Sequence, residues 1–243
     1  MPDMSLFPKQ DKPLPPSPIH AKQLVICSGT SDWPSKIDGD TTSLAGIIGA
    51  SKRTLFRPQY PVMVVNCDLP ATTSSKSPNS ASAYLFPDNL YFDDIPLDKV
   101  DKFFENYVRP SSTEAVQSED IPNPRPASPL ILICGHASRD VRCGVIAPLL
   151  VEEFTKVLTE KGLYFDAETN PTGIRVSVSS HVGGHAFAGN VIYHPSDSSS
   201  AALPASVWYG KVFPHHVQGI VEETILNGRV VQPLLRGYGP RKW

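Results

Sequence analysis

The segment LILICGHASRDVRCGVIAPLLVEEFTKVLTEKG (residues 130–162) decides the fold class. LILIC is a continuous apolar run of strand length, which is typical of a strand buried on both faces. The segment after the polar loop repeats apolar residues at helical spacing, at Leu150, Phe154, Val157 and Leu158. Gly162 is suited to end this helix, and Pro148 is expected in its first turn rather than its interior. A buried strand followed by an amphipathic helix predicts an α/β protein.

The alternation of strand and helix extends in both directions. In the first half, QLVICSG and VMVVNCD predict buried strands, YLFPDNLYF predicts a weaker third strand, and PLDKVDKFFENYV predicts a helix. In the second half, IRVSVSS, GNVIYH and SVWYGKV predict strands, and FPHHVQGIVEETILNG predicts a final helix. No repeat of fixed period joins the two halves. We therefore expect an N-terminal α/β domain over residues 21–109, a proline-rich linker over 110–127 and a second α/β domain over 128–237.

The composition limits the classes of function. Residues 1–20 are rich in proline and predict a disordered lead-in without the features of a signal peptide or mitochondrial presequence, and residues 238–243 predict a flexible tail. The net charge is −2 and the sequence pI is about 6.4, without a basic stripe, so no nucleic-acid partner is expected. No apolar run is long enough to span a membrane. These features predict a cytoplasmic protein, with a mitochondrial location as the alternative.

Four residues in the second half have the chemistry of metal ligands. Cys134 ends a predicted strand, and Cys143 follows eight residues later, just before or within the first turn of a helix. His181 and His185 follow the strand IRVSVSS and flank a glycine pair that can adopt positive φ and bring backbone close to a metal. Two thiols and two imidazoles on loops at strand ends suit zinc or an iron–sulfur cluster. From spacing alone, this site and an ordinary set of buried cysteines and hydrogen-bonded histidines are equally open.

The surroundings of these residues favour a thiolate. A helix N-terminus lowers the pKa of a nearby cysteine, and Arg139 and Arg142 are expected to add positive charge. His136 is predicted to have a structural role near the site. The other two cysteines, Cys27 and Cys67, lie within apolar runs and are interpreted as core residues.

Three stretches, CGHASRDVRCG, HVGGHAFAGNVI and WYGKVFPHHVQGIVEETILNG, resemble the sucrase/ferredoxin-like family of thioredoxin-like ferredoxins. CSGTSDWPSKI, from residue 27, extends the resemblance over nearly all of the predicted folded chain. The resemblance implies a thioredoxin-like ferredoxin C-terminal domain packed on a smaller α/β N-terminal domain. Wider relatives hold a 2Fe–2S cluster with four cysteines, the last two of which are separated by three residues. Here His181 and His185 have that spacing.

The resemblance also implies a ligand set. A eukaryotic branch of the family, with the actin-patch-distal and altered-inheritance-of-mitochondria proteins, is understood to use two cysteines and two histidines. By this resemblance Cys134 and Cys143 hold one iron of a 2Fe–2S cluster, and His181 and His185 hold the other. Imidazole ligands raise the reduction potential and allow coupled uptake of an electron and a proton.

The implied function is electron transfer in cellular redox homeostasis, by a carrier rather than a stand-alone enzyme. A redox partner protein is expected, with an NAD(P)H-dependent reductase as donor, because the chain has no dinucleotide fingerprint of its own. The final residue, Trp243, resembles the recognition signal of clients of the cytosolic iron–sulfur assembly machinery. An alternative from another class stays open, in which the same four residues form a structural zinc site or a thiol redox sensor.

Overall fold

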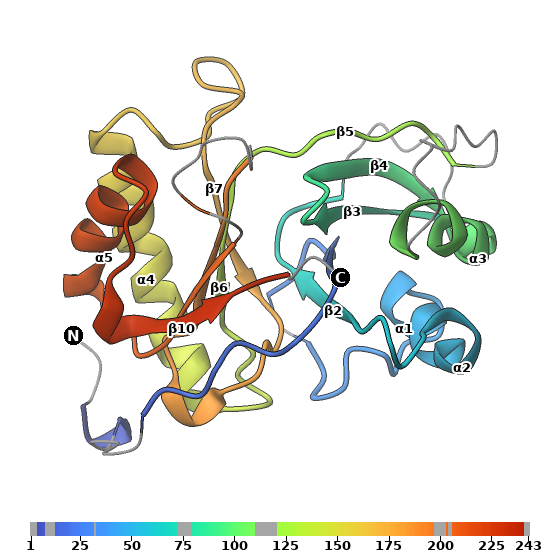
Figure 1. Ribbon diagram of the computed structural model, residues 1–243, viewed down its shortest axis with the longest axis horizontal. Helices are drawn as coiled ribbons and strands as arrows, with labels where there is room; N and C mark the ends of the chain where they lie inside the picture. The colour runs from blue at the N-terminus through green and yellow to red at the C-terminus, as the bar shows by residue number, and fades with distance from the viewer. Residues whose placement is uncertain are drawn as a thin grey trace. The chain divides into compact units, whose positions relative to one another are not determined.

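The computed structural model describes residues 4–7, 13–31, 33–71, 79–109, 121–196, 203 and 206–240 (Figure 1). The chain divides into two compact units. The C-terminal unit comprises residues 1–18 and 128–239, and the N-terminal unit comprises residues 19–127 and 240–243. Within the C-terminal unit, residues of the predicted lead-in contact the sheet, since the Ser17 backbone N–H donates to the Arg236 carbonyl at 2.9 Å.

The sheet of the C-terminal unit is built around β6 (Leu130–Cys134). β6 pairs in parallel with β7 (Arg175–Ser179) and antiparallel with β8 (Val191–His194). The sheet continues antiparallel through β9 (Val207–Tyr209) to β10 (Leu235–Tyr238). The order is therefore β7-β6-β8-β9-β10.

Two helical segments cover one face of this sheet (Figure 1). α4 (Val141–Glu160) connects β6 to β7, and α5 (Pro214–Ile220) continues into the π-helical turn η5 (Val221–Leu226) before β10. The core between sheet and helices includes Ile131, Ile133, Leu150, Phe154, Leu158, Val217 and Ile220. The remaining short 3-10 turns are η1 (Met4–Leu6), η4 (His185–Phe187) and η6 (Gln232–Leu234). A parallel β-α-β unit followed by an antiparallel pair and a helix is the thioredoxin-like arrangement, so the predicted fold is confirmed.

The strands of the N-terminal unit are arranged around β1 (Lys22–Cys27). β1 pairs in parallel with β2 (Val62–Cys67) and antiparallel with β3 (Ser80–Phe86). β3 pairs with β4 (Leu90–Pro96), and β4 pairs with the short β5 (Arg125–Pro126). The order β2-β1-β3-β4-β5 repeats that of the C-terminal unit, strand for strand.

Helical turns of the N-terminal unit fall at matching places in the chain. Between β1 and β2 lie α1 (Leu44–Ala50) and α2 (Lys52–Leu55). After β4 come η2 (Leu97–Lys99), α3 (Val100–Phe103) and the π-helical turn η3 (Phe104–Val108). Leu24 and Ile26 of β1 share a core with Ile48 of α1 and Phe103 of α3.

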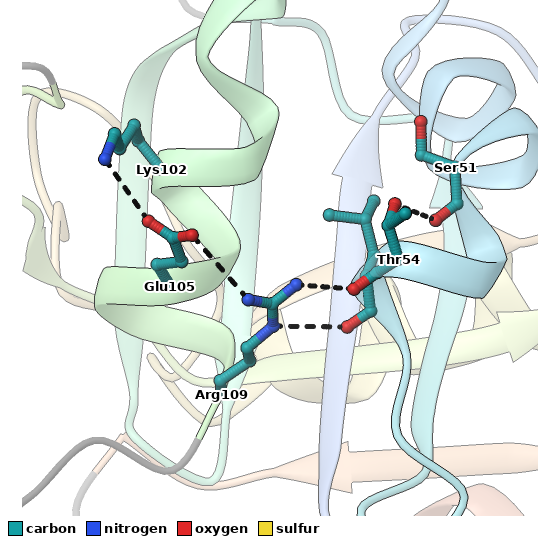
Figure 2. A network of polar contacts seen from close by, with 6 residues as sticks. Ser51, Thr54, Lys102, Glu105 and Arg109 are labelled. Carbon is teal, nitrogen blue, oxygen red and sulfur yellow. Dashed lines mark hydrogen bonds and ion pairs between the residues drawn. The ribbon is translucent and has the colours of Figure 1, made fainter.

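Arg109 ties two of these helical segments together (Figure 2). Its guanidinium donates to the carbonyls of Thr54 and Leu55 at the end of α2, at 2.7 and 3.4 Å. It also pairs with Glu105 of η3 at 3.8 Å. The last turn of η3 is thereby fixed to the C-terminal end of α2, whose carbonyls have no partner within their own helix.

Two sequence predictions are wrong. The weak strand YLFPDNLYF is a hairpin, because residues 87–89 reverse the chain between β3 and β4, with Asn89 at φ 54°. Pro148 lies inside α4 rather than in its first turn. The helix starts earlier because Asp140 caps it by accepting from the Arg142 backbone N–H at 3.0 Å.

Other predictions hold. Strands form in all six of the predicted runs. β1 begins one residue before QLVICSG and ends within it. β2, β6, β7, β8 and β9 lie entirely within VMVVNCD, LILICG, IRVSVSS, GNVIYH and SVWYGKV, respectively. Gly162 follows α4 with φ +69°, as expected of the residue that ends a helix. Much of the predicted linker, residues 110–127, lies outside the described residues. Across the described ranges, no helix combines the length and apolar character needed to cross a membrane.

Candidate metal centre

The two predicted cysteine ligands are brought together at one end of the C-terminal sheet. Cys134 is the last residue of β6, and Cys143 is the third residue of α4. The loop between them closes because the Cys143 backbone N–H donates to the Asp140 carbonyl at 3.0 Å. Both side chains are buried, with 1% of their surface exposed. Cys143 therefore lies in the first turn of a helix, as the sequence predicts.

The two thiols are hydrogen-bonded to each other, and this bond shifts their pKa values in opposite directions. Both are free cysteines. The hydrogen bond from Cys143 lowers the pKa of Cys134 well below its ordinary value, against the opposing effect of burial. The same hydrogen bond, followed by burial, raises the pKa of Cys143. The pair therefore favours a Cys134 thiolate that accepts from a Cys143 thiol.

His181 joins this pair from the loop after β7. Its side chain is hydrogen-bonded to Cys134 and lowers the pKa of that thiol further, as do the backbone amides of Val182 and His136. Three of the four predicted ligands thus meet, from β6, α4 and the loop after β7. The backbone of His185 begins η4, but its side chain lies outside the described part of the structure.

His136 supports the loop that carries His181. The His181 backbone N–H donates to Nδ1 of His136 at 3.1 Å, and the imidazole is buried, with 2% exposed. Nδ1 of His136 is therefore the acceptor that holds the backbone of His181. The contact agrees with the structural role predicted for His136.

The charge near α4 differs from the expectation. Arg142 forms a double hydrogen bond with Asp140, at 2.9 and 2.7 Å, so the charge of its guanidinium is compensated locally. The Asp140 carboxylate contributes to the raised pKa of Cys143, and Arg142 opposes it. Arg139 is exposed. The thiolate therefore depends mainly on hydrogen bonds rather than on these two arginines.

The glycine pair between the two histidines adopts the predicted conformation. Gly183 and Gly184 have φ values of +82° and +72°, in the left-handed region that favours glycine. A Cβ atom on Gly184 would lie 2.7 Å from the guanidinium of Arg236, in β10. Arg236 is a residue near the site that the sequence did not indicate.

The donor set suits a metal centre in its chemistry. A buried thiolate, a second thiol and an imidazole are the ligand types of zinc and iron–sulfur sites. In the described structure these groups bond to one another. Among the side chains that the structure describes, which exclude that of His185, no group of three or more His, Cys, Asp or Glu residues is arranged to hold a metal ion.

The sheet and its helices define a thioredoxin-like protein with a cysteine–histidine cluster at one end of the sheet. Comparisons with known proteins define the family. The sucrase/ferredoxin-like family profile matches residues 16–237. Altered inheritance of mitochondria protein 32 from Debaryomyces hansenii is 38% identical over 236 residues, covering 88% of this chain and 80% of the relative. The protein of the same name from Clavispora lusitaniae is 35% identical over 221 residues, covering 84% and 74%. The chain belongs to the sucrase/ferredoxin-like family.

Two further similarities are more distant. Actin patches distal protein 1 from Saccharomyces cerevisiae is 31% identical over 149 residues, covering 58% of this chain and 46% of the relative. Among solved structures, a thioredoxin-like 2Fe–2S ferredoxin from Aquifex aeolicus is 21% identical with a TM-score of 0.29, covering 47% of this chain and 94% of that one. A likeness this distant says nothing about a cofactor in this chain.

Proposed function

We propose that the protein transfers electrons and carries one 2Fe–2S cluster in its C-terminal unit. The proposed ligands are Cys134 and Cys143 for one iron, and His181 and His185 for the other. The main support is the convergence of Cys134, Cys143 and His181, which come from three separate segments yet meet at the carboxyl end of β6. Membership of the family is a second, independent support.

The surrounding residues suit the task of holding an anionic cofactor. When bound, the cluster would supply a centre that accepts and releases one electron. The backbone amides of Val182 and His136 already donate to the Cys134 sulfur, and such donors stabilise thiolate ligands. His136 fixes the backbone of His181, which orients the imidazole. Burial of both thiols excludes water from the centre.

Replacement of each proposed histidine ligand by cysteine tests the assignment. The protein is purified without oxygen, and its visible absorbance, its electron paramagnetic resonance after reduction and its reduction potential are measured. A thiolate adds negative charge, so His181→Cys and His185→Cys should shift the spectrum and lower the potential. His215→Cys, at an exposed histidine of α5 in the same unit, is the matched control and should change neither. An unchanged spectrum and potential in the first two variants would defeat the assignment.

Coupled proton transfer is the finer part of the proposal. A histidine bound to iron through one nitrogen can carry a proton on the other, and its affinity for that proton changes with the charge of the iron. The potential of the wild-type protein should therefore fall as pH rises, by up to about 59 mV per pH unit for a one-electron couple. A potential independent of pH between about 6 and 10 would exclude this coupling.

A structural zinc site or a thiol redox sensor is the second candidate, favoured by the direct contact between Cys134 and Cys143. Neighbouring thiols can close a disulfide, and zinc uses the same ligand types. Colour separates the candidates. A cluster gives brown protein that dithionite bleaches, whereas zinc and disulfide forms are colourless.

The redox partner and the location stay predictions. We propose a reductase that uses NAD(P)H as the electron donor. The names of the relatives agree with the mitochondrial alternative to a cytoplasmic location. Trp243 lies outside the described residues; its deletion should lower cluster occupancy in cells but leave reconstituted protein intact, if the assembly machinery recognises it.

A further inference from the structure

Arg236 is a buried cation next to the candidate centre. Only 6% of its surface is exposed, although arginine is rarely buried unless it is paired. No acidic side chain in the described ranges forms an ion pair with it. Its guanidinium instead donates to neutral oxygens, those of Gly183, Asn190, Pro15 and Pro16.

These contacts hold the histidine loop at two points. Nη1 of Arg236 donates to the Gly183 carbonyl at 3.2 Å, between the two histidines, and to Oδ1 of Asn190, where the loop returns to the sheet. The side chain of Asn190 in turn donates to the Gly184 carbonyl at 3.2 Å. Arg236 and Asn190 thus form a closed set of hydrogen bonds with the glycine pair. Such a set fixes the backbone on both sides of His185.

The same guanidinium also bonds to residues 15–16, in the N-terminal segment of the C-terminal unit. Nε donates to the Pro15 carbonyl at 3.1 Å, and Nη2 donates to the Pro16 carbonyl at 3.3 Å. The planar guanidinium can bond several carbonyls at once, which the ammonium group of lysine cannot do with the same geometry. Residues 15–16 are therefore fastened to the histidine loop through one side chain.

The positive charge of Arg236 lies against the histidine loop of the candidate centre. Its buried guanidinium bonds to the carbonyl of Gly183, between the two histidines. Burial lowers the pKa of Arg236, and the negative charge of Cys134 raises it, which agrees with this position. A buried cation stabilises negative charge on a neighbouring centre more than an exposed one would.

We propose that Arg236 is a positioning residue for the centre, which holds the loop of His181 and His185 in place and supplies a buried positive charge next to that loop. The second role rests on the proposed function, since it concerns the charge of the bound cluster. The first role does not, because its hydrogen bonds lie within the chain itself.

Hydrogen exchange tests the first role on the full chain after removal of metal. Arg236→Met should speed exchange of the amides of residues 181–190 by about tenfold or more, because the loop loses its charged hydrogen bonds. Arg236→Lys should give an intermediate exchange rate, since lysine keeps the positive charge but cannot bond several carbonyls at once as the planar guanidinium does. Arg229→Met is the matched control, because Arg229 is an exposed arginine of the same unit paired with Glu223. Its exchange rates in this loop should equal those of the wild type.

The reduction potential tests the second role in the protein that carries its cluster. Arg236→Met should lower the potential, because the reduced cluster loses a nearby cation, while Arg236→Lys should keep it close to the wild-type value. A merely structural role would move both variants together. Equal potentials in Arg236→Met and the wild type would overturn the electrostatic role.

The outcomes separate this inference from the proposed function. Wild-type exchange rates in Arg236→Met would overturn the positioning role and leave the cluster proposal standing. A protein without a cluster would defeat the proposed function, and faster exchange in the variant would still support positioning. If Arg236→Met does not fold, Asn190→Ala decides, since it removes one anchor of the loop and leaves Arg236 in place. Unchanged exchange of the loop in Asn190→Ala and Arg236→Lys would then overturn the positioning role.

Discussion

The N-terminal and C-terminal units share one chain topology but differ in chemistry. In each, a central strand pairs in parallel with the next strand and antiparallel with the one after it, and helical segments follow the first and fourth strands. In each, the central strand ends in a buried cysteine, Cys27 in β1 and Cys134 in β6. Among the residues that the structure describes, only those of the C-terminal unit surround that cysteine with a second thiol from a helix and an imidazole from a loop. The shared fold supplies the position, and the loops supply the chemistry.

The difference is clearest at the register partners of the two cysteines. Cys27 pairs with Cys67 across β1 and β2, whereas Cys134 pairs with Ser179 across β6 and β7. The N-terminal unit therefore has its two thiols on neighbouring strands, and the chain after β2 continues as Asp68 and Leu69 without a histidine. Each unit thus has two thiols, one of which ends its central strand, so the presence of two thiols cannot by itself define the centre.

The largest expected effect concerns the four cysteines, and its failure would contradict the difference between the two units. Cys134→Ser or Cys143→Ser should abolish bound iron, because a serine hydroxyl is a poor substitute for a thiolate ligand. Cys27→Ser and Cys67→Ser, the matched changes in the N-terminal unit, should keep wild-type occupancy. Iron content and visible absorbance per folded protein provide the measurement. Equal loss of iron in all four variants would mean that the N-terminal thiols also serve the centre.

A smaller effect compares glycines with positive φ in the two units. Gly184 and Gly29 have φ values of +72° and +69°, so alanine at either position is strained by about 1–2 kcal/mol. At Gly184 the new Cβ would also lie 2.7 Å from Arg236, whereas at Gly29 the nearest atom is Cα of Pro70 at 3.8 Å. Gly184→Ala should therefore lower the free energy of unfolding by about 1–3 kcal/mol more than Gly29→Ala. Urea unfolding followed by circular dichroism measures both, and equal losses would contradict the close approach of Arg236.

The smallest effect concerns pH. The hydrogen bond with Lys52 lowers the pKa of Asp38 in the N-terminal unit, and hydrogen bonds from Thr169 and Glu168 lower that of Asp166 in the C-terminal unit. A lowered pKa in the folded state adds stability above the unfolded value of about 4, which is lost as pH falls through the folded value. Asp38→Asn and Asp166→Asn should therefore each lose slightly less stability than the wild type between pH 7 and pH 3.

The salt dependence of stability distinguishes the contribution of Asp38 from that of Asp166. The Asp38–Lys52 contact is an exposed ion pair, which salt screens, whereas Asp166 bonds to neutral donors within its own turn. Melting temperatures measured in low and high salt should show that only the Asp38 contribution declines. A salt-dependent contribution from Asp166 of the same size would contradict the assignment of its partners.

The sequence predicts most of the central strands, because continuous apolar runs mark strands that are buried on both faces. It does not predict β10, whose LRGY segment has only one large aliphatic residue, or α1, where two glycines weaken the helical pattern. The sequence also does not reveal that the two units share one chain topology. Their similarity lies in strand order and direction, which different side chains can produce, so no period appears along the chain.

The sequence predicts the candidate ligands of the centre, but it does not predict the residue that holds their loop in place. Cys134, Cys143 and His181 carry distinctive side chains at recognisable spacing, and the structure brings them together. Arg236 was missed because its partners are mostly backbone carbonyls, which any residue provides. A single arginine in a strand has no pattern that would single it out.

Arg236, which bonds to the histidine loop, also bonds to Pro15, which lies 221 positions earlier in the chain. During synthesis on the ribosome, a nascent chain that has reached residue 228 already contains both thiols and both imidazoles but not β10. The hydrogen bonds from Arg236 to the histidine loop can form only after that last strand has been synthesised. A chain that stops short of β10 would therefore carry the histidine loop without this anchor.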